Sequence, residues 1–80
     1  MTPLVRALRA LGLEGEIMLS GRWIKVRGER CSVYIAEVSW NKLYCTWCDT
    51  PQARSVEFYG DPIEAIEAGL RRAATPWAEE

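Results

Sequence analysis

The sequence predicts a small α+β domain in which an antiparallel meander of strands is flanked by an N-terminal and a C-terminal helix. Three observations support this prediction: an apolar stripe at helical spacing near the N-terminus, a central block with two-residue periodicity, and a second helical stripe behind a capping motif. The 80 residues suffice for one domain with a thin core. We expect four or five strands in a single domain over residues 1–75, followed by a short acidic tail over 76–80.

The first helix is predicted to begin after Thr2, whose hydroxyl can accept from the first free amides. Pro3 follows at the first helical position, where its missing N–H costs nothing. Gly12 and Leu13 form the glycine and apolar pair that is typical of a Schellman C-terminus. The expected buried stripe consists of Leu4, Val5, Leu8 and Leu11.

The central block contains five candidate strands separated by turn residues. Residues 16–19 and 23–27 are expected to form a hairpin around Ser20 and Gly21, although the first of these strands has the weakest pattern. Residues 31–38 have the highest β propensity. Residues 43–48 and 55–59 complete the meander, with turns expected at 28–30, 40–42 and 49–52.

The second helix carries the sharpest local signal. Asp61 can cap it, Pro62 occupies its first turn, and Glu64 stands at the capping-box position. Gly69 interrupts the helical propensity and indicates a close contact between helix and sheet, and Pro76 prevents continuation. The expected buried stripe consists of Ile63, Ile66, Leu70 and Ala73.

Both helices are most simply buried on one face of the sheet. We assign to this face Ile17, Leu19, Ile24, Val26, Cys31, Val33, Ile35, Leu43, Cys45, Trp47, Val56 and Phe58. The opposite face then carries Met18, Trp23, Lys25, Arg27, Tyr34, Ala36, Val38, Tyr44, Thr46, Cys48, Glu57 and Tyr59. A one-residue shift would exchange the two faces of a strand, and both phases fit the pattern of residues 43–48.

The second face is too apolar and aromatic for a surface that meets only water. We therefore predict an interaction surface made of Trp23, Lys25, Arg27, Tyr34, Tyr44 and Tyr59. Its expected partner is a protein, most simply a second copy that forms a homodimer with Trp23, Tyr34 and Tyr44 as anchors. Single-stranded nucleic acid is the alternative, because aromatic side chains beside cations can stack bases. The net charge of −1 and a pI near 5.5 favour the protein.

Catalysis is not expected. The chain contains no histidine, which is the commonest general base and a frequent metal ligand. It also lacks a glycine-rich phosphate loop and a nucleophile elbow. We predict a regulator or accessory subunit that is not an enzyme and that needs no cofactor.

Three cysteines are weak candidates for a structural zinc site, which is the second alternative function. Cys45 and Cys48 form a C-x-x-C pair, and Cys31 could be a third ligand beside Asp49 or a group from another chain. However, residues three apart in a strand face opposite sides, so the expectation is reduced structural thiols.

The chain is expected to be cytoplasmic and without a membrane span. It has no run of 18 apolar residues, and Arg6 and Arg9 interrupt the region where a signal peptide needs an apolar centre. The sequence contains eight arginines and two lysines, a bias that is typical of GC-rich and thermophilic sources.

Overall fold

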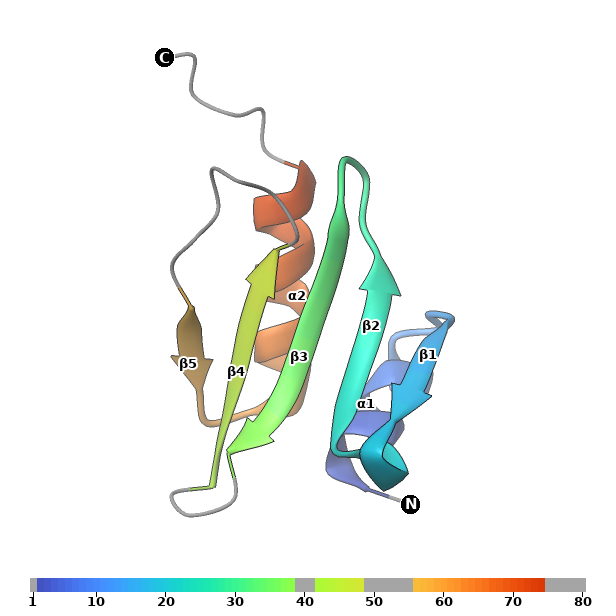
Figure 1. Cartoon of the computed structure of the whole chain (residues 1–80), viewed down its shortest axis with the longest axis vertical. Helices are drawn as coiled ribbons and strands as arrows, with labels where there is room; N and C mark the ends of the chain where they lie inside the picture. The colour runs from blue at the N-terminus through green and yellow to red at the C-terminus, as the bar shows by residue number, and fades with distance from the viewer. Residues whose placement is uncertain (1, 39–41, 49–55, 75–80) are drawn as a thin grey trace.

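The computed structural model describes residues 2–38, 42–48 and 56–74 of the chain, and these residues form five strands and two helices (Figure 1). The strands lie in sequence order in one antiparallel sheet, as predicted. The elements are α1 (Pro3–Ala10), β1 (Gly15–Met18), the 3₁₀ turn η1 (Leu19–Gly21), β2 (Trp23–Arg27), β3 (Ser32–Val38), β4 (Leu43–Cys48), β5 (Glu57–Tyr59) and α2 (Pro62–Ala74). The expected turn residues at 40–41 and 49–52, Ser55, and Pro76 with the tail lie outside the described residues.

Helix α1 has the ends that its sequence predicts. The backbone N–H of Val5 donates to the Thr2 hydroxyl at 3.3 Å, so Thr2 is the N-cap. At the other end Gly12 has a φ of 69°, and the N–H of Leu13 donates to the Leu8 carbonyl at 3.1 Å. This bond and the left-handed glycine confirm the Schellman C-terminus.

Helix α2 is also confirmed. The N–H of Ile63 donates to the Asp61 carboxylate at 3.2 Å, which satisfies one of the free amides of the first turn. Glu64 lies in the first turn, while Arg71 and Arg72 lie in the last. These charges complement the helix dipole at both ends.

One buried cluster joins both helices to the sheet. Leu4 and Leu8 of α1 and Ile66 of α2 meet Ile24 and Ile35 of the sheet in this cluster. Figure 1 shows α1 behind β1 and β2, and α2 behind β3 and β4, in the same view. Buried and more exposed side chains alternate along β2 and the first part of β3 as predicted. The residues predicted to face the helices, Ile24, Val26, Val33 and Ile35, are at most 1% exposed.

The closest approach between helix and sheet occurs at Gly69, as its position in the sequence indicates. A Cβ atom on Gly69 would lie 2.5 Å from the hydroxyl oxygen of Thr46 and would also clash with the side chain of Val33. Thr46 is fully buried below it, and the Cys48 thiol lies 3.8 Å from the Gly69 carbonyl. The helix therefore rests on small side chains of β4.

The prediction that Leu43, Cys45 and Trp47 of β4 face the helices is wrong. Tyr44, Thr46 and Cys48 are buried on the helix side, while Leu43, Cys45 and Trp47 point to the other side. The physical reason is the close contact at Gly69, because the opposite phase would place the indole of Trp47 below a helix that leaves room only for small groups.

The prediction that Phe58 of β5 faces the helices is also wrong, for a related reason. Tyr44 pairs with Tyr59 and Cys45 pairs with Phe58, so β5 follows the phase of β4. Phe58 is consequently 55% exposed on the side away from the helices, and Val56 is 44% exposed just before the strand. Tyr59 lies partly buried against the core.

The first strand also differs from its prediction. Ile17 pairs with Ile24 and so lies on the helix side, but it remains 46% exposed because β1 is the edge of the sheet. Leu19 is not in the strand. It begins η1 with a φ of 52° and is 66% exposed.

We expect Gly69→Ala to lower the free energy of unfolding by about 1–3 kcal/mol, because the added methyl group must displace Thr46 or Val33. Gly60→Ala is the matched control, since a Cβ at Gly60 has no atom within 4 Å. That variant should be neutral or slightly more stable. Urea unfolding followed by circular dichroism measures both, and equal stabilities of the two variants would contradict close packing at Gly69.

Candidate interaction surface

The face of the sheet opposite the two helices is here called the open face. It carries four of the six aromatic side chains among the described residues. Its members follow from the register, because residues directly opposite each other in antiparallel strands share a face. They are Glu16, Met18, Trp23, Lys25, Arg27, Ser32, Tyr34, Ala36, Val38, Leu43, Cys45, Trp47 and Phe58. The open face is thus apolar over β3, β4 and β5 and charged mainly at β1 and β2.

Trp23, Tyr34 and Trp47 form the aromatic cluster at the middle of the open face. The rings of Tyr34 and Trp47, which are partners in the register, are stacked with centroids 5.5 Å apart and planes inclined by 15°. Trp23 is tilted against both, at 6.4 Å from Tyr34 and 6.1 Å from Trp47. Such offset and tilted pairs stabilise one another beyond the area that they bury.

The small side chain of Ala36 allows the rings of Trp23 on β2 and Trp47 on β4 to meet across β3. It lies on the intervening strand, opposite Trp23 in one direction and Cys45 in the other. Its methyl group leaves space above β3, so Trp23 and Trp47 approach each other across that strand. A larger side chain at this position would separate the rings.

The charged margin of the open face begins directly beside the aromatic cluster. The Lys25 ammonium lies 5.7 Å from the centroid of the Tyr34 ring, which is a cation–π distance. Glu16 is the register partner of Lys25 on β1, and Arg27 is exposed one step further along β2. Charges of both signs therefore frame one side of the cluster.

The indole N–H of Trp23 is buried and has no acceptor among the residues that the structure describes. A buried donor without a partner costs about 1–3 kcal/mol of stability. The aromatic cluster therefore buries one hydrogen-bond donor that the described residues leave unsatisfied, unlike the interior of a well-packed domain.

The structure brings together only part of the predicted interaction surface. Trp23, Lys25, Arg27 and Tyr34 lie on the open face as expected. Tyr44 does not, because it is 9% exposed within the core, and Tyr59 faces the same side as Tyr44. The Tyr59 hydroxyl donates to the Glu57 carboxylate at 2.6 Å, and Arg72 of α2 lies 3.8 Å from the same carboxylate oxygen.

Trp47 and Phe58 are the aromatic members of the open face that sequence reasoning missed, and Leu43 and Cys45 were missed with them. Trp47 was assigned to the core although both phases fit the pattern of residues 43–48, and Phe58 was assigned there because it alternates with apolar Val56. The signal that could have found them is the helix, because Ala65, Ala68, Gly69 and Ala73 give α2 a small-residue surface that cannot accommodate a tryptophan below it.

The cysteines do not form the three-ligand group that the zinc alternative requires. Cys45 lies on the open face and Cys48 on the helix side, as the strand period requires for residues three apart. Cys31 shares the helix side with Cys48 and packs against the same cluster. Within residues 2–38, 42–48 and 56–74, no set of three or more potential ligands is placed to hold a metal ion, and Asp49 lies outside these residues.

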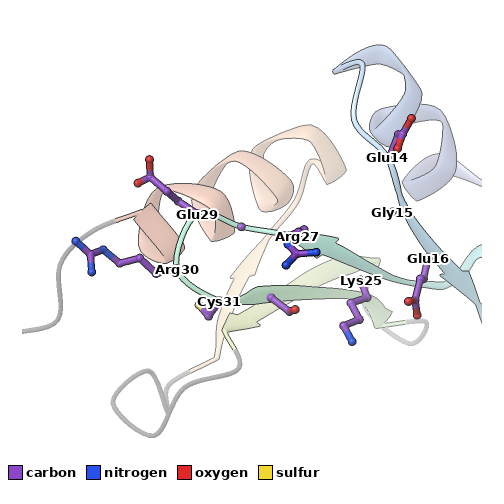
Figure 2. Close-up of a pocket in the computed structure, with 10 residues that line it drawn as sticks. Glu14, Gly15, Glu16, Lys25, Arg27, Glu29, Arg30 and Cys31 are labelled. Carbon is purple, nitrogen blue, oxygen red and sulfur yellow. The ribbon is translucent and has the colours of Figure 1, made fainter.

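A cleft of about 590 Å³ opens between the start of β1 and the turn that joins β2 to β3. Figure 2 shows Glu14 and Glu16 on the β1 side, Lys25 and Arg27 on β2, and Glu29 and Arg30 extending outward from the turn. Its other lining residues are Gly15, Gly28, Cys31 and Ser32. The acidic and basic side chains balance, so the cleft does not select strongly for anions or cations.

Comparison with models of protein families, with curated proteins and with solved structures finds no significant match to this chain. The functional argument therefore depends on the residues of this chain. Neither helix in the described part of the chain has the length and apolar character needed to cross a bilayer.

Alkaline pH should weaken the fold through Tyr44. Burial raises the pKa of this phenol above its ordinary value of 10.0, and the charges of Glu37 and Asp61 raise it further. Because the folded state holds the proton more tightly than the unfolded chain, the stabilisation is complete below pH 10 and is lost as the pH rises above it.

Urea unfolding at pH 8 and pH 10.5 tests this expectation. Tyr44→Phe should lose less stability between these two pH values than the unmodified chain does. An identical loss in both proteins would show that Tyr44 does not carry the effect.

Proposed function

We propose that this domain is a non-catalytic protein-interaction module that associates with a second copy of itself, sheet to sheet, through the open face. It would act as a regulator or accessory subunit. The observation that carries the proposal is the aromatic cluster of Trp23, Tyr34 and Trp47, which shares the open face with exposed Phe58 and which neither helix of the described residues covers. Contiguous apolar surface of this kind usually marks an interaction site.

The composition and layout of the open face favour a protein partner. Protein interfaces are enriched in Trp, Tyr, Phe and Met near their centre and are polar at the rim. The open face has this arrangement, with the aromatic cluster over β2, β3 and β4 and with Glu16, Lys25 and Arg27 at the β1 and β2 margin. The rigid aromatic side chains also lose little conformational entropy on binding.

A second copy is the simplest protein that fits. Two sheets can pack face to face at a spacing of about 10 Å, with their inner side chains interdigitated. The open face provides large rings at its centre and small groups such as Ala36 and Cys45 beside them. Its margin carries both signs of charge, so Glu16 of one copy can meet Lys25 or Arg27 of the other.

Single-stranded nucleic acid is the second candidate for the same face. The Lys25 ammonium beside the Tyr34 ring is the specific observation that favours it, because bases stack on aromatic rings while cations hold phosphates. However, the rings of Tyr34 and Trp47 stack on each other, which leaves fewer free ring faces for bases. Protein association is therefore the primary proposal.

Two substitutions of comparable exposed residues test self-association. Phe58→Glu places a charge on the open face, and Ile17→Glu places one on the helix side of the opposite edge strand. We expect the first to raise the dimer dissociation constant at least about tenfold, since a buried unpaired charge costs more than 1.4 kcal/mol. The second should leave it within about threefold.

Light scattering and sedimentation across a dilution series measure these constants, and Tyr34→Glu at the centre of the aromatic cluster should give monomers of lower stability. A monomeric unmodified chain, or equal effects of Phe58→Glu and Ile17→Glu, would contradict the proposal. Quenching of tryptophan fluorescence by single-stranded RNA or DNA, with affinity that falls as salt is added, would instead support the second candidate.

A further inference from the structure

Two cysteines that are distant in the sequence lie together at one end of the sheet. Cys48 is the last residue of β4 and pairs with Val33, while Cys31 comes two residues before Val33 on the same side of the sheet. Both are free thiols that pack in the core cluster. The thiols interact directly: besides burial, the charge and the hydrogen bond of the Cys31 thiol raise the pKa of Cys48.

The two thiols differ in their access to solvent. Cys48 is 4% exposed, and its thiol lies 3.8 Å from the Gly69 carbonyl. Cys31 is half-buried and contributes to the wall of the charged cleft, between Arg30 and Ser32. Figure 2 shows the Cys31 side chain at this cleft. A small oxidant that enters the cleft can therefore reach Cys31 while Cys48 remains covered.

We propose that Cys31 and Cys48 form a reversible intramolecular disulfide when a hydroperoxide oxidises the domain, with Cys31 as the attacking thiol and Cys48 as the resolving thiol. The two sulfur atoms lie on the helix side of the sheet, so the disulfide does not rest on the proposed self-association, although the cleft that leads to Cys31 shares Glu16, Lys25, Arg27 and Ser32 with the open face. It also differs from the Cys45 and Cys48 motif of the sequence, because Cys45 lies on the opposite face.

The chemistry proceeds in two balanced steps. The Cys31 thiolate attacks the terminal oxygen of ROOH, the O–O bond breaks, ROH leaves after protonation, and Cys31 becomes a sulfenic acid. The sulfur of Cys48 then attacks the sulfenic sulfur, the S–O bond breaks, and water leaves with the second thiol proton. In sum, two thiols lose two electrons to the peroxide and give one disulfide, ROH and water.

The position of Cys31 suits a bond that forms after folding. Disulfide geometry requires the two Cβ atoms to lie about 4 Å apart. Cys31 precedes β3, which begins at Ser32, and its carbonyl accepts from the Gly28 N–H at 2.9 Å. Its backbone is thus fixed in the turn, and only the side chain has to rotate toward Cys48. The new bond would tie the turn between β2 and β3 to the end of β4.

The experiment uses the folded, reduced chain with hydrogen peroxide as the oxidant. In the Cys45→Ser variant, which retains Cys31 and Cys48, we expect the intact monomer mass to fall by about 2 Da and both thiols to disappear together. Tryptic peptides 31–42 and 43–54 should then be found linked, and dithiothreitol should restore the original mass. The melting temperature of the oxidised form should rise by more than about 10 °C, because the bond closes a loop of chain.

Cys31→Ser and Cys48→Ala in the same background separate the two roles. Cys31→Ser should react slowly with peroxide, because its remaining thiol is covered, whereas Cys48→Ala should accumulate sulfenic acid that dimedone traps. Stable sulfinic acid on Cys31 with a free Cys48, a disulfide between chains, or the absence of any mass change would overturn the proposal. The linked peptides are also mapped in the oxidised unmodified chain, so the test remains valid if a variant fails to fold.

Discussion

Helix α2 lies so close to the sheet at Gly69 that only small groups fit between them. Thr46 and Val33 fill that contact, and a methyl group on Gly69 would already collide with them. This steric limit favours the phase of β4 that places Thr46 below Gly69 and Trp47 on the other side, while Tyr44 of the same phase packs in the core cluster. Because β5 pairs with β4 in register, the same limit also directs Phe58 away from the core.

The open face is a consequence of that packing. Once Thr46 and Cys48 point toward α2, Trp47 must point away, where it stacks on Tyr34 and meets Trp23 across β3. Residues that could have filled the core thus form an aromatic surface on the side of the sheet away from both helices. The same choice places Cys48 on the same side of the sheet as Cys31, so one steric constraint underlies both the proposed interface and the proposed redox pair.

The proposed interface and the proposed disulfide lie on opposite sides of the sheet, but the cleft that leads to Cys31 shares Glu16, Lys25 and Arg27 with the margin of the open face. Self-association depends on apolar area and on the rings around Tyr34, whereas disulfide formation depends on access to Cys31 through the charged cleft. A disulfide between Cys31 and Cys48 would fix the end of the sheet without inserting any group into the open face. Oxidation would thus change the stability of the domain more than its affinity for a second copy.

The sequence by itself determined the element order, the capping of both helices by Thr2 and Asp61, and the alternation of β2 and β3, because these features depend on local hydrogen bonds and on strongly patterned strands. It also predicted Trp23 and Tyr34 on the open face. Only the tertiary structure decided the phases of β4 and β5, since Tyr44 and Trp47 are both apolar enough for a core, and local pattern cannot distinguish them. The space below Gly69 makes that distinction, and it depends on a helix more than twenty residues away along the chain.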